Sequence, residues 1–196
     1  MACSNPYVAA KLRRWEKYLD NYRLPEWEAI PDFGLYMEQV IDLLKQYLDY
    51  LPPELKEEQF ITASTINNYV RTKVMPEPIK KRYYREHIAY LIIICTLKQT
   101  LSIALIHRII PTGLQREEVE AVYRSYVRQH TYSAKNFTDL IRLLAAPILE
   151  HPECSESAVD SAEDLITRSA IIGGFSRLLA QKLLLLEEPE TAERPS

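Results

Sequence analysis

The sequence predicts an all-α fold, and three observations support this. Glycine occurs only four times in 196 residues, too few for the many tight turns of a β-sandwich or β-barrel. Apolar residues recur at helical spacing along most of the chain. Prolines and capping residues lie between these periodic segments, where helices should begin and end. The length suits one compact domain or two small ones with a real hydrophobic core.

The first two helices are marked by proline. A helix should begin at Asn5-Pro6, because asparagine is a good cap and proline fits the first helical position. Residues 24–31 form a proline-bounded connector, whose Trp27 should dock on the core. A second helix is expected over residues 33–51, where two prolines end it.

The middle of the chain should hold three shorter helices. The first is capped by Thr62 or Ser64 and ends near Val74, before two further prolines. A basic segment, residues 79–84, separates it from a buried helix over residues 85–99. A helix over residues 102–110 follows after a short turn.

The last third should hold three more helices. Residues 112–115 have capping-box form and should open a helix that runs to about His130. A separate helix around residues 137–144 should be ended or kinked by Pro147. Helical periodicity then runs from residue 157 to about 188, interrupted only by Gly173-Gly174. That pair favours a helix break, and the alternative is a close approach of another helix, for example across a dimer.

Composition and motifs argue against several classes of protein. The chain has no GxSxG, HExxH or Gly-rich phosphate loop, and its four histidines lack metal spacing, so we expect no enzyme, cofactor or metal. The three scattered cysteines and the lack of a signal-peptide pattern predict a reduced cytoplasmic protein. The apolar run at 88–97 is about half of the roughly 20 residues that span a membrane, so no membrane contact is expected.

A basic patch stands out in an acidic chain. The whole chain carries a net charge of −3, whereas residues 61–90 hold six cations and two anions, a local charge of +4. Such a patch suggests a partner with phosphates, and DNA in particular. The predicted DNA-binding residues are Ser64, Thr65, Asn67, Asn68, Arg71, Lys73, Lys80, Lys81 and Arg82.

These residue types have complementary roles on DNA. Asparagine amides match the major-groove edge of adenine, and Arg71 can contact guanine or a phosphate. Lys80, Lys81 and Arg82 supply charge for sequence-independent phosphate attraction. The alternatives are a solvated or protein-binding helix face for the first group, and a charge cluster that balances acidic helices for the second. Tyr83 and Tyr84 are expected to pack against the core.

The order of these parts resembles the DNA-binding domain of the mercury-resistance-regulator (MerR) family. Thr65-Ile66-Asn67-Asn68-Tyr69-Val70 stands at its recognition core, Val74-Met75-Pro76 at the helix exit and Lys81-Arg82-Tyr83-Tyr84 at its wing. The chain departs from that pattern in two places. The turn before the recognition core lacks glycine, and Asn67-Asn68 replace the arginine of that core.

The chain is more similar still to an uncharacterised bacterial family, domain of unknown function 1836. The shared segments are Ile-Asn-Asn-Tyr-Val at 66–70, Lys-Lys-x-Tyr at 80–83 and Leu-Lys-Gln at 97–99. This similarity covers about residues 24–110 and implies no biochemical activity.

We therefore divide the chain into an N-terminal helix and connector (1–31), a helix-turn-helix-like domain (32–111), a C-terminal helical part (112–186) and a disordered tail (187–196). A recognition helix over about 63–74 and a basic wing at 79–84 would bind double-stranded DNA in a transcriptional regulator. The C-terminal part would serve dimerisation or sensing, and its long apolar stripe suggests a homodimer. The alternative is a protein-interaction module that retains the fold without specific DNA binding.

Overall fold

The computed structural model describes residues 5–49, 61–149 and 158–186. Within these residues the protein is all-α, as predicted, and its only β-pairs are two isolated bridges. The elements are α1 (Asn5–Asn21), the 3-10 helix η1 (Trp27–Ala29), α2 (Met37–Tyr47), α4 (Ala63–Arg71), α5 (Arg85–Leu97), α6 (Ile103–Ile109), α7 (Arg116–Leu144), α8 (Ala146–Leu149) and α9 (Ala162–Leu186).

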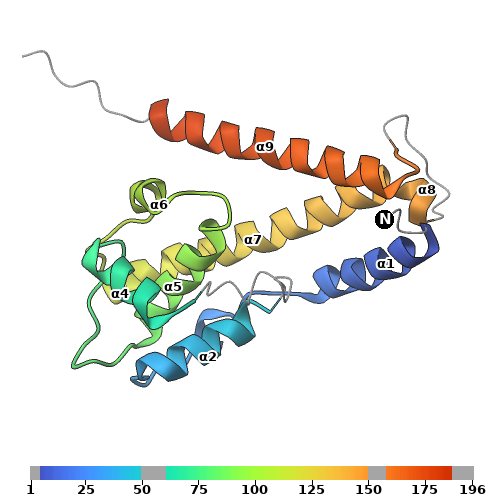
Figure 1. Cartoon of the computed structure of the whole chain (residues 1–196). Helices are drawn as coiled ribbons and strands as arrows, with labels where there is room; N and C mark the ends of the chain where they lie inside the picture. Colours follow the sequence, from blue (N-terminus) through green and yellow to red (C-terminus); the bar gives the residue numbers. More distant parts are fainter. Residues whose placement is uncertain (1–4, 50–60, 150–157, 187–196) are drawn as a thin grey trace, which may run out of the picture.

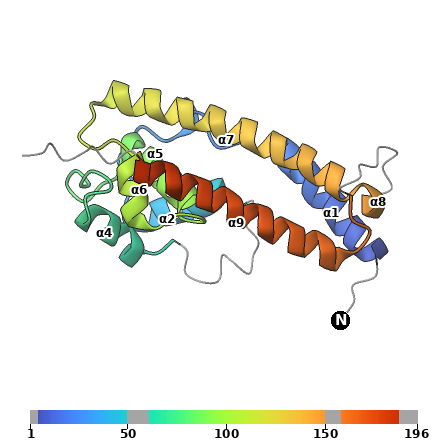
Figure 2. The same ribbon diagram turned by 90° about the horizontal axis from the view of Figure 1, so that it is seen from above.

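Long helices connect two ends of the molecule. Figure 1 shows α7 and α9 running along its length, with α4, α5 and α6 at one end and α8 at the other. The same arrangement is seen from above in Figure 2, where α1 lies beside the α8 end of α7. The helices at one end therefore lie apart from those at the other end.

The main hydrophobic core forms around α5. Every residue from 87 to 96 is buried, which explains why this helix is apolar on all sides. The buried members of this core run from Leu24 to Val127 and include the first half of α7. Trp27 is buried, as predicted, and its ring lies 6.0 Å from that of Tyr123. A second cluster joins α1, the end of α7, α8 and the start of α9.

The second helix begins later than predicted. It starts at Met37, and Phe33 is 66% exposed, outside the apolar stripe we expected it to join. The preceding residues are extended because Leu35 pairs with Tyr83 through two backbone hydrogen bonds of 2.8 and 2.9 Å. The helical periodicity at 33–36 therefore does not produce a helix. The long-range pairing of Leu35 with Tyr83 holds these residues extended, and the local sequence does not predict that pairing.

The two helices expected over 112–130 and 137–144 are one helix, α7. It begins at Arg116, where Gln115 is the cap and donates its backbone N–H to the Glu118 carboxylate at 2.8 Å. No glycine or proline lies within it, so nothing stops the helix. The predicted start near Thr112 and the predicted separation were therefore wrong.

Gly173-Gly174 do not break α9, so the favoured break is also wrong. A Cβ added at either glycine would meet no atom within 4 Å, so neither glycine serves a close approach within the chain. Strong helix formers on both sides compensate for a helix propensity about 1 kcal/mol poorer per glycine than alanine. The two-proline stop at 52–53, the tail at 187–196, Cys3, Cys154 and His151 lie outside the described residues.

Candidate nucleic-acid interface

The exposed face of α4 carries the polar residues that the sequence singled out. Thr62 is the N-cap: its hydroxyl accepts the backbone N–H of Thr65 at 3.1 Å, and the Thr65 hydroxyl accepts that of Thr62 at 2.9 Å. Thr65 is thus held in the cap. The hollow along this face, of about 860 Å³, is lined among the described residues by Thr62, Ser64, Thr65, Asn67, Asn68 and Arg71.

Arg71 lies at the end of this face and is oriented by its neighbour. Its Nη2 donates to the Asn68 side-chain oxygen at 2.7 Å. Ser64, Asn67, Asn68 and Arg71 are spaced three or four residues apart, so they project from one side of the helix. The buried side holds Ile66 at 0% and Tyr69 at 3% exposure, which fixes the orientation of α4 on the core.

Lys73 follows the C-terminal end of α4, at a position that usually holds glycine. The predicted helix reached about Val74, but α4 ends at Arg71 because the chain turns back on itself. Lys73 donates its N–H to Val70 and Val74 donates to Tyr69, each at 3.0 Å, which is the hydrogen-bond pattern of a Schellman motif. The motif needs a left-handed residue, and Lys73 has φ 56°. Its side chain is exposed.

Residues 79–82 form a tight hairpin turn, which we call the basic turn. Ile79 and Arg82 exchange two backbone hydrogen bonds of 3.0 Å. The two residues between them, Lys80 and Lys81, have φ 50° and 64°, and positive φ at both positions indicates a type I′ turn. Asn-Gly or Gly-Gly is usual there, because most side chains are strained in this conformation. The turn thus presents two lysines from an unfavourable backbone.

Arg82 and Gly34 attach the basic turn to the start of α2. The Arg82 guanidinium stacks on the Tyr36 ring at 4.5 Å and donates to the Tyr36 hydroxyl at 2.8 Å and the Gly34 carbonyl at 3.2 Å. A Cβ on Gly34 would lie 2.9 Å from the Arg82 Cβ, so only glycine fits without a shift. Sequence reasoning missed Gly34 and Tyr36, and the scarcity of glycine was the one signal that pointed to Gly34.

His87 holds the segment between Lys73 and α5. It is 4% exposed; its Nδ1 accepts the Tyr84 backbone N–H at 3.1 Å, and its Nε2 lies 2.9 Å from the Glu77 carbonyl oxygen. This arrangement requires a neutral ring with its proton on Nε2. The buried Tyr83 ring packs edge-on against the His87 ring at 5.9 Å, consistent with its predicted packing role.

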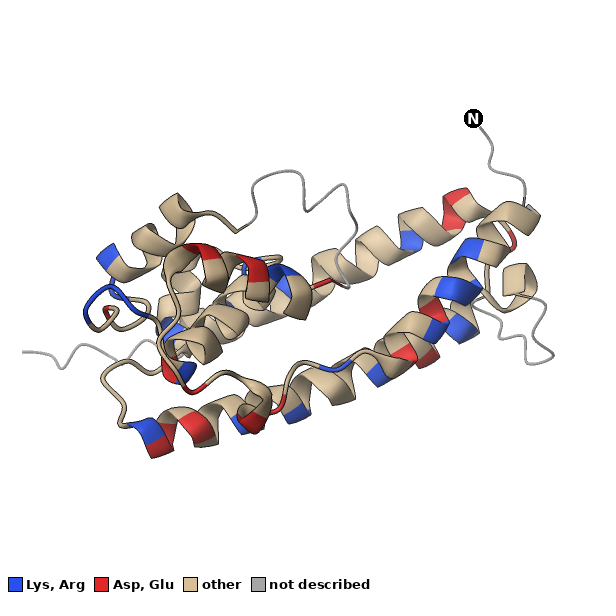
Figure 3. Cartoon of the chain, turned by 90° about the horizontal axis from the view of Figure 1, so that it is seen from below, with Lys and Arg blue, Asp and Glu red and all other residues tan. Residues whose placement is uncertain are grey.

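The lysines of this surface have no acidic partners in the part of the chain that the structure describes. Among the described residues, Lys73, Lys80 and Lys81 form no ion pair, and all three are exposed. Figure 3 shows Lys and Arg gathered where α4 ends and the chain continues towards α5. We call this region the basic surface: the outer face of α4 (Ser64, Asn67, Asn68, Arg71) together with Lys73, Lys80, Lys81 and Arg82.

A family model matches the segment that builds this surface. The family is described as a domain of unknown function, DUF1836, and the match covers residues 25–126, just over half of the chain. The chain belongs to the DUF1836 family. No curated protein and no solved structure matches it. The matched residues of the DUF1836 domain coincide with the main core, which runs from Leu24 to Val127.

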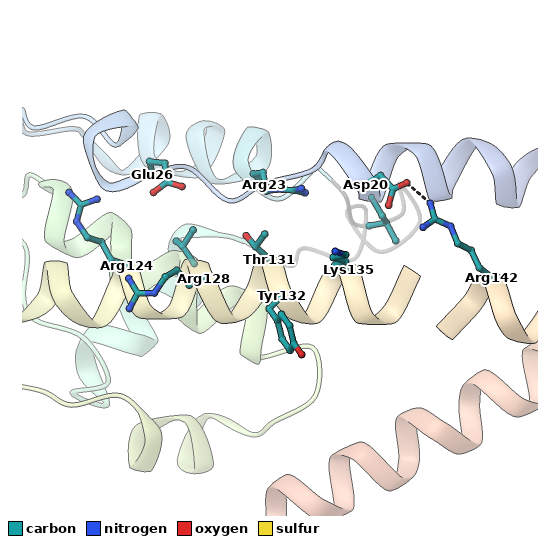
Figure 4. Close-up of a pocket in the computed structure, with 11 residues that line it drawn as sticks. Asp20, Arg23, Glu26, Arg124, Arg128, Thr131, Tyr132, Lys135 and Arg142 are labelled. Atoms are coloured by element: carbon teal, nitrogen blue, oxygen red, sulfur yellow. Dashed lines mark hydrogen bonds and ion pairs between the residues drawn. The ribbon is translucent and has the colours of Figure 1, made fainter. Parts of the chain in front are cut away.

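A second concavity lies at the edge of the DUF1836 domain and differs in its electrostatics. It has a volume of about 830 Å³ and lies between the end of α1, the connector and α7 (Figure 4). Two of its four arginines are paired with carboxylates: Arg142 Nη2 is 2.6 Å from Asp20, and Arg124 Nε donates to Glu120 at 2.8 Å. Arg124 and Arg142 therefore connect parts of the chain to one another.

The DUF1836 domain also contains one thiol, which is inert in character. Cys95 lies fully buried in α5, and burial raises the pKa of its thiol to about 12. In the described part of the chain, no group of three His, Cys, Asp or Glu side chains is placed to hold a metal ion.

Proposed function

We propose that this DUF1836 protein is a DNA-binding transcriptional regulator with a winged, MerR-like helix-turn-helix. Helix α4 would be the recognition helix in the major groove, and the basic turn would be the wing on the phosphate backbone. Asn67, Asn68 and Arg71 would contact base edges, because amides and guanidinium groups pair with adenine and guanine there. Lys73, Lys80 and Lys81 would contact phosphates.

The observation that carries this proposal is the conformation of the three lysines. Among the described residues, every non-glycine residue with positive φ is a lysine: Lys73, Lys80 and Lys81. Each left-handed position disfavours a side chain by about 1 kcal/mol. Glycine or asparagine would be more stable at all three, so the sequence keeps positive charge where folding alone disfavours it. A polyanion in contact with this surface accounts for that choice.

The arrangement of the two parts also supports the proposal. Arg82, tethered to Tyr36 and Gly34, fixes the basic turn to the start of α2, and His87 fixes the chain between α4 and the turn. Recognition helix and wing would therefore keep a constant spacing, which simultaneous contact with a groove and its flanking phosphates requires.

The test uses a variant that should fold at least as well as the wild type. Lys80→Asn with Lys81→Gly installs the residues that a type I′ turn prefers and removes two charges. We expect its urea midpoint to stay the same or rise. Its affinity for a random-sequence duplex should fall at least tenfold, and the slope of log K against log salt should decrease by about 2.

The matched control removes the same charge elsewhere. Lys11→Ala with Lys17→Ala changes two exposed lysines of α1, far from α4 in Figure 1. The control should bind DNA like the wild type. If both double variants lost the same affinity, the loss would come from the change in net charge and not from the basic turn. No loss in the Asn-Gly variant, together with specific capture of a protein by the wild type, would favour the interaction-module alternative.

A further inference from the structure

Helix α9 is apolar, long and almost entirely uncovered by the described parts of its own chain. Of its 25 residues only Ala162, Leu165 and Leu184 are buried. It touches the rest of the molecule along one side: Leu165 and Ile172 contribute to the second cluster, Ala180 packs against the main core, and Leu184 accepts a hydrogen bond from Arg108 of α6. Its large apolar side chains are more than half exposed: Ile166, Ile171, Phe175, Leu178, Leu179, Leu183, Leu185 and Leu186.

An apolar helix of this kind normally has a partner. Soluble monomers rarely expose apolar patches of more than a few hundred Å². By length and composition α9 is also the one described helix that would be able to cross a membrane. However, Arg177 and Lys182 lie in its apolar half, and a central Arg or Lys disfavours insertion by about 2.5–3.5 kcal/mol. A protein partner fits these cations better than lipid does.

One face of α9 carries a regular stripe. Positions 164, 168, 171, 175, 178, 182 and 185 are separated alternately by four and three residues, which is the spacing of a coiled-coil seam. At roughly 100° per residue, the stripe lies on the side of α9 opposite to the buried Ala162 and Leu184. Its apolar members Ile171, Phe175 and Leu178 therefore face away from the described parts of the chain, where a second helix has access to them, whereas Arg168 is partly buried.

The stripe is complementary to itself when reversed. An antiparallel copy centred on residue 173 brings Asp164 opposite Lys182, and Ile171 opposite Phe175. Arg168 then lies opposite the apolar Leu178, and an arginine stem can pack on an apolar side chain. A parallel copy would instead place Asp164 beside Asp164 and Lys182 beside Lys182, and like charges in contact disfavour pairing.

We propose that α9 pairs with α9 of a second copy as an antiparallel two-helix interface about a twofold axis near residue 173. Such an interface is isologous, so each contact occurs twice. Ile171, Phe175 and Leu178 form its apolar centre, and two Asp164–Lys182 pairs close its ends. The interface does not depend on DNA binding, so the two proposals succeed or fail separately.

The test measures the mass of the full chain in solution by sedimentation equilibrium. The wild type should be a dimer at high protein concentration. Phe175→Glu places a charge at the centre of the stripe, and because the Phe175 side chain is 68% exposed, the variant should keep the fold of the chain. We expect this variant to dissociate at least tenfold more readily. Ile166→Glu is the matched control, because Ile166 is 69% exposed on the same helix but lies off the stripe, and it should remain dimeric.

A charge swap tests the antiparallel register. Asp164→Lys should weaken the dimer, since it meets Lys182 of the other copy, and Asp164→Lys with Lys182→Asp should restore it. The Ser161 hydroxyl also donates to the Asp164 carboxylate at 2.8 Å, but the swap cannot restore that hydrogen bond, so recovery of the dimer reports the interhelical pair. A monomeric wild type, a dimeric Phe175→Glu variant, a swap without rescue, or a monomer that binds phosphatidylcholine vesicles through α9 would each overturn the proposal.

Discussion

The positive charges of two regions differ in their surroundings. Where α7 packs against α1 and η1, Arg142 contacts Glu16, Asp20 and Asp139, and Arg124 contacts Glu28 and Glu120, while the nearby Arg128 and Lys135 form no ion pair among the described residues. On the basic surface, Lys73, Lys80 and Lys81 have no carboxylate partner among the described residues. The first region uses planar guanidinium groups that bridge several carboxylates, and the second uses lysines on strained turns.

This difference separates charges that hold the chain together from charges that await a partner. An arginine between two helices stabilises the fold, and its replacement should lower stability. A lysine in a left-handed position lowers stability, and its replacement by glycine or asparagine should raise stability. Three predictions can break or sharpen this comparison.

The largest effect is expected on sequence discrimination. Arg71→Ala removes a guanidinium that Asn68 orients towards the hollow on α4. Loss of one bidentate base contact should weaken discrimination at one base pair by about 1–3 kcal/mol, with little change in stability. Competition binding with single-base variants of a selected site measures this. Equal affinity losses for all sequences would assign Arg71 to the phosphate backbone instead.

A smaller effect is expected for the paired Arg142, and it should change stability and not DNA binding. Arg142→Gln leaves Glu16, whose side chain is only 14% exposed, without its cation. Partly exposed ion pairs contribute up to about 1 kcal/mol each, so the free energy of unfolding should fall by about 1 kcal/mol while DNA affinity stays the same. Urea denaturation provides the measurement, with Arg128→Gln on the same helix as a neutral control. A stable Arg142→Gln variant that lost DNA affinity would reverse the comparison.

The smallest expected effect is a pH dependence of the stability that arises from one histidine. His130 of α7 packs between the Tyr22 and Tyr126 rings, and burial lowers its pKa below the usual 6.5. The unfolded chain therefore binds the proton more tightly, so stability is full above about pH 6.5 and falls as the pH drops towards the folded pKa. The urea concentration at the unfolding midpoint should decrease as the pH is lowered from about 7.5 to about 5.5. His130→Gln should show a smaller fall, and an equal fall in both would exclude His130 as its source.

Local sequence signals predicted most helices, but long-range contacts determined where they end. Thr62 and Ser102 begin helices where the sequence predicted them, because capping depends on neighbouring residues, and α1 is helical from Asn5, the first described residue. Phe33 was wrongly placed in a helix, since the Leu35–Tyr83 pairing joins residues 48 positions apart. The sequence predicted interruptions between residues 130 and 137 and at Gly173-Gly174, but neither segment contains a proline, and α7 and α9 continue through them.

The residue types of the candidate site could be predicted from sequence, but their backbone could not. Asparagine, arginine and lysine within one short segment indicated the surface that the structure places around α4. Nothing local predicted left-handed Lys73, Lys80 and Lys81, because positive φ is usually signalled by glycine or asparagine. The tether from Arg82 to Gly34 and Tyr36 likewise depends on residues far apart in the chain.

The most direct test of DNA binding by the basic surface is selection from a random-sequence duplex library at two salt concentrations. Wild type should enrich a short motif and bind it more weakly at the higher salt, and the variant with Asn and Gly at positions 80 and 81 should bind the same motif at least tenfold more weakly, with a smaller salt dependence. No enriched motif at low salt, or an Asn-Gly variant with the affinity and salt dependence of the wild type, would contradict the account.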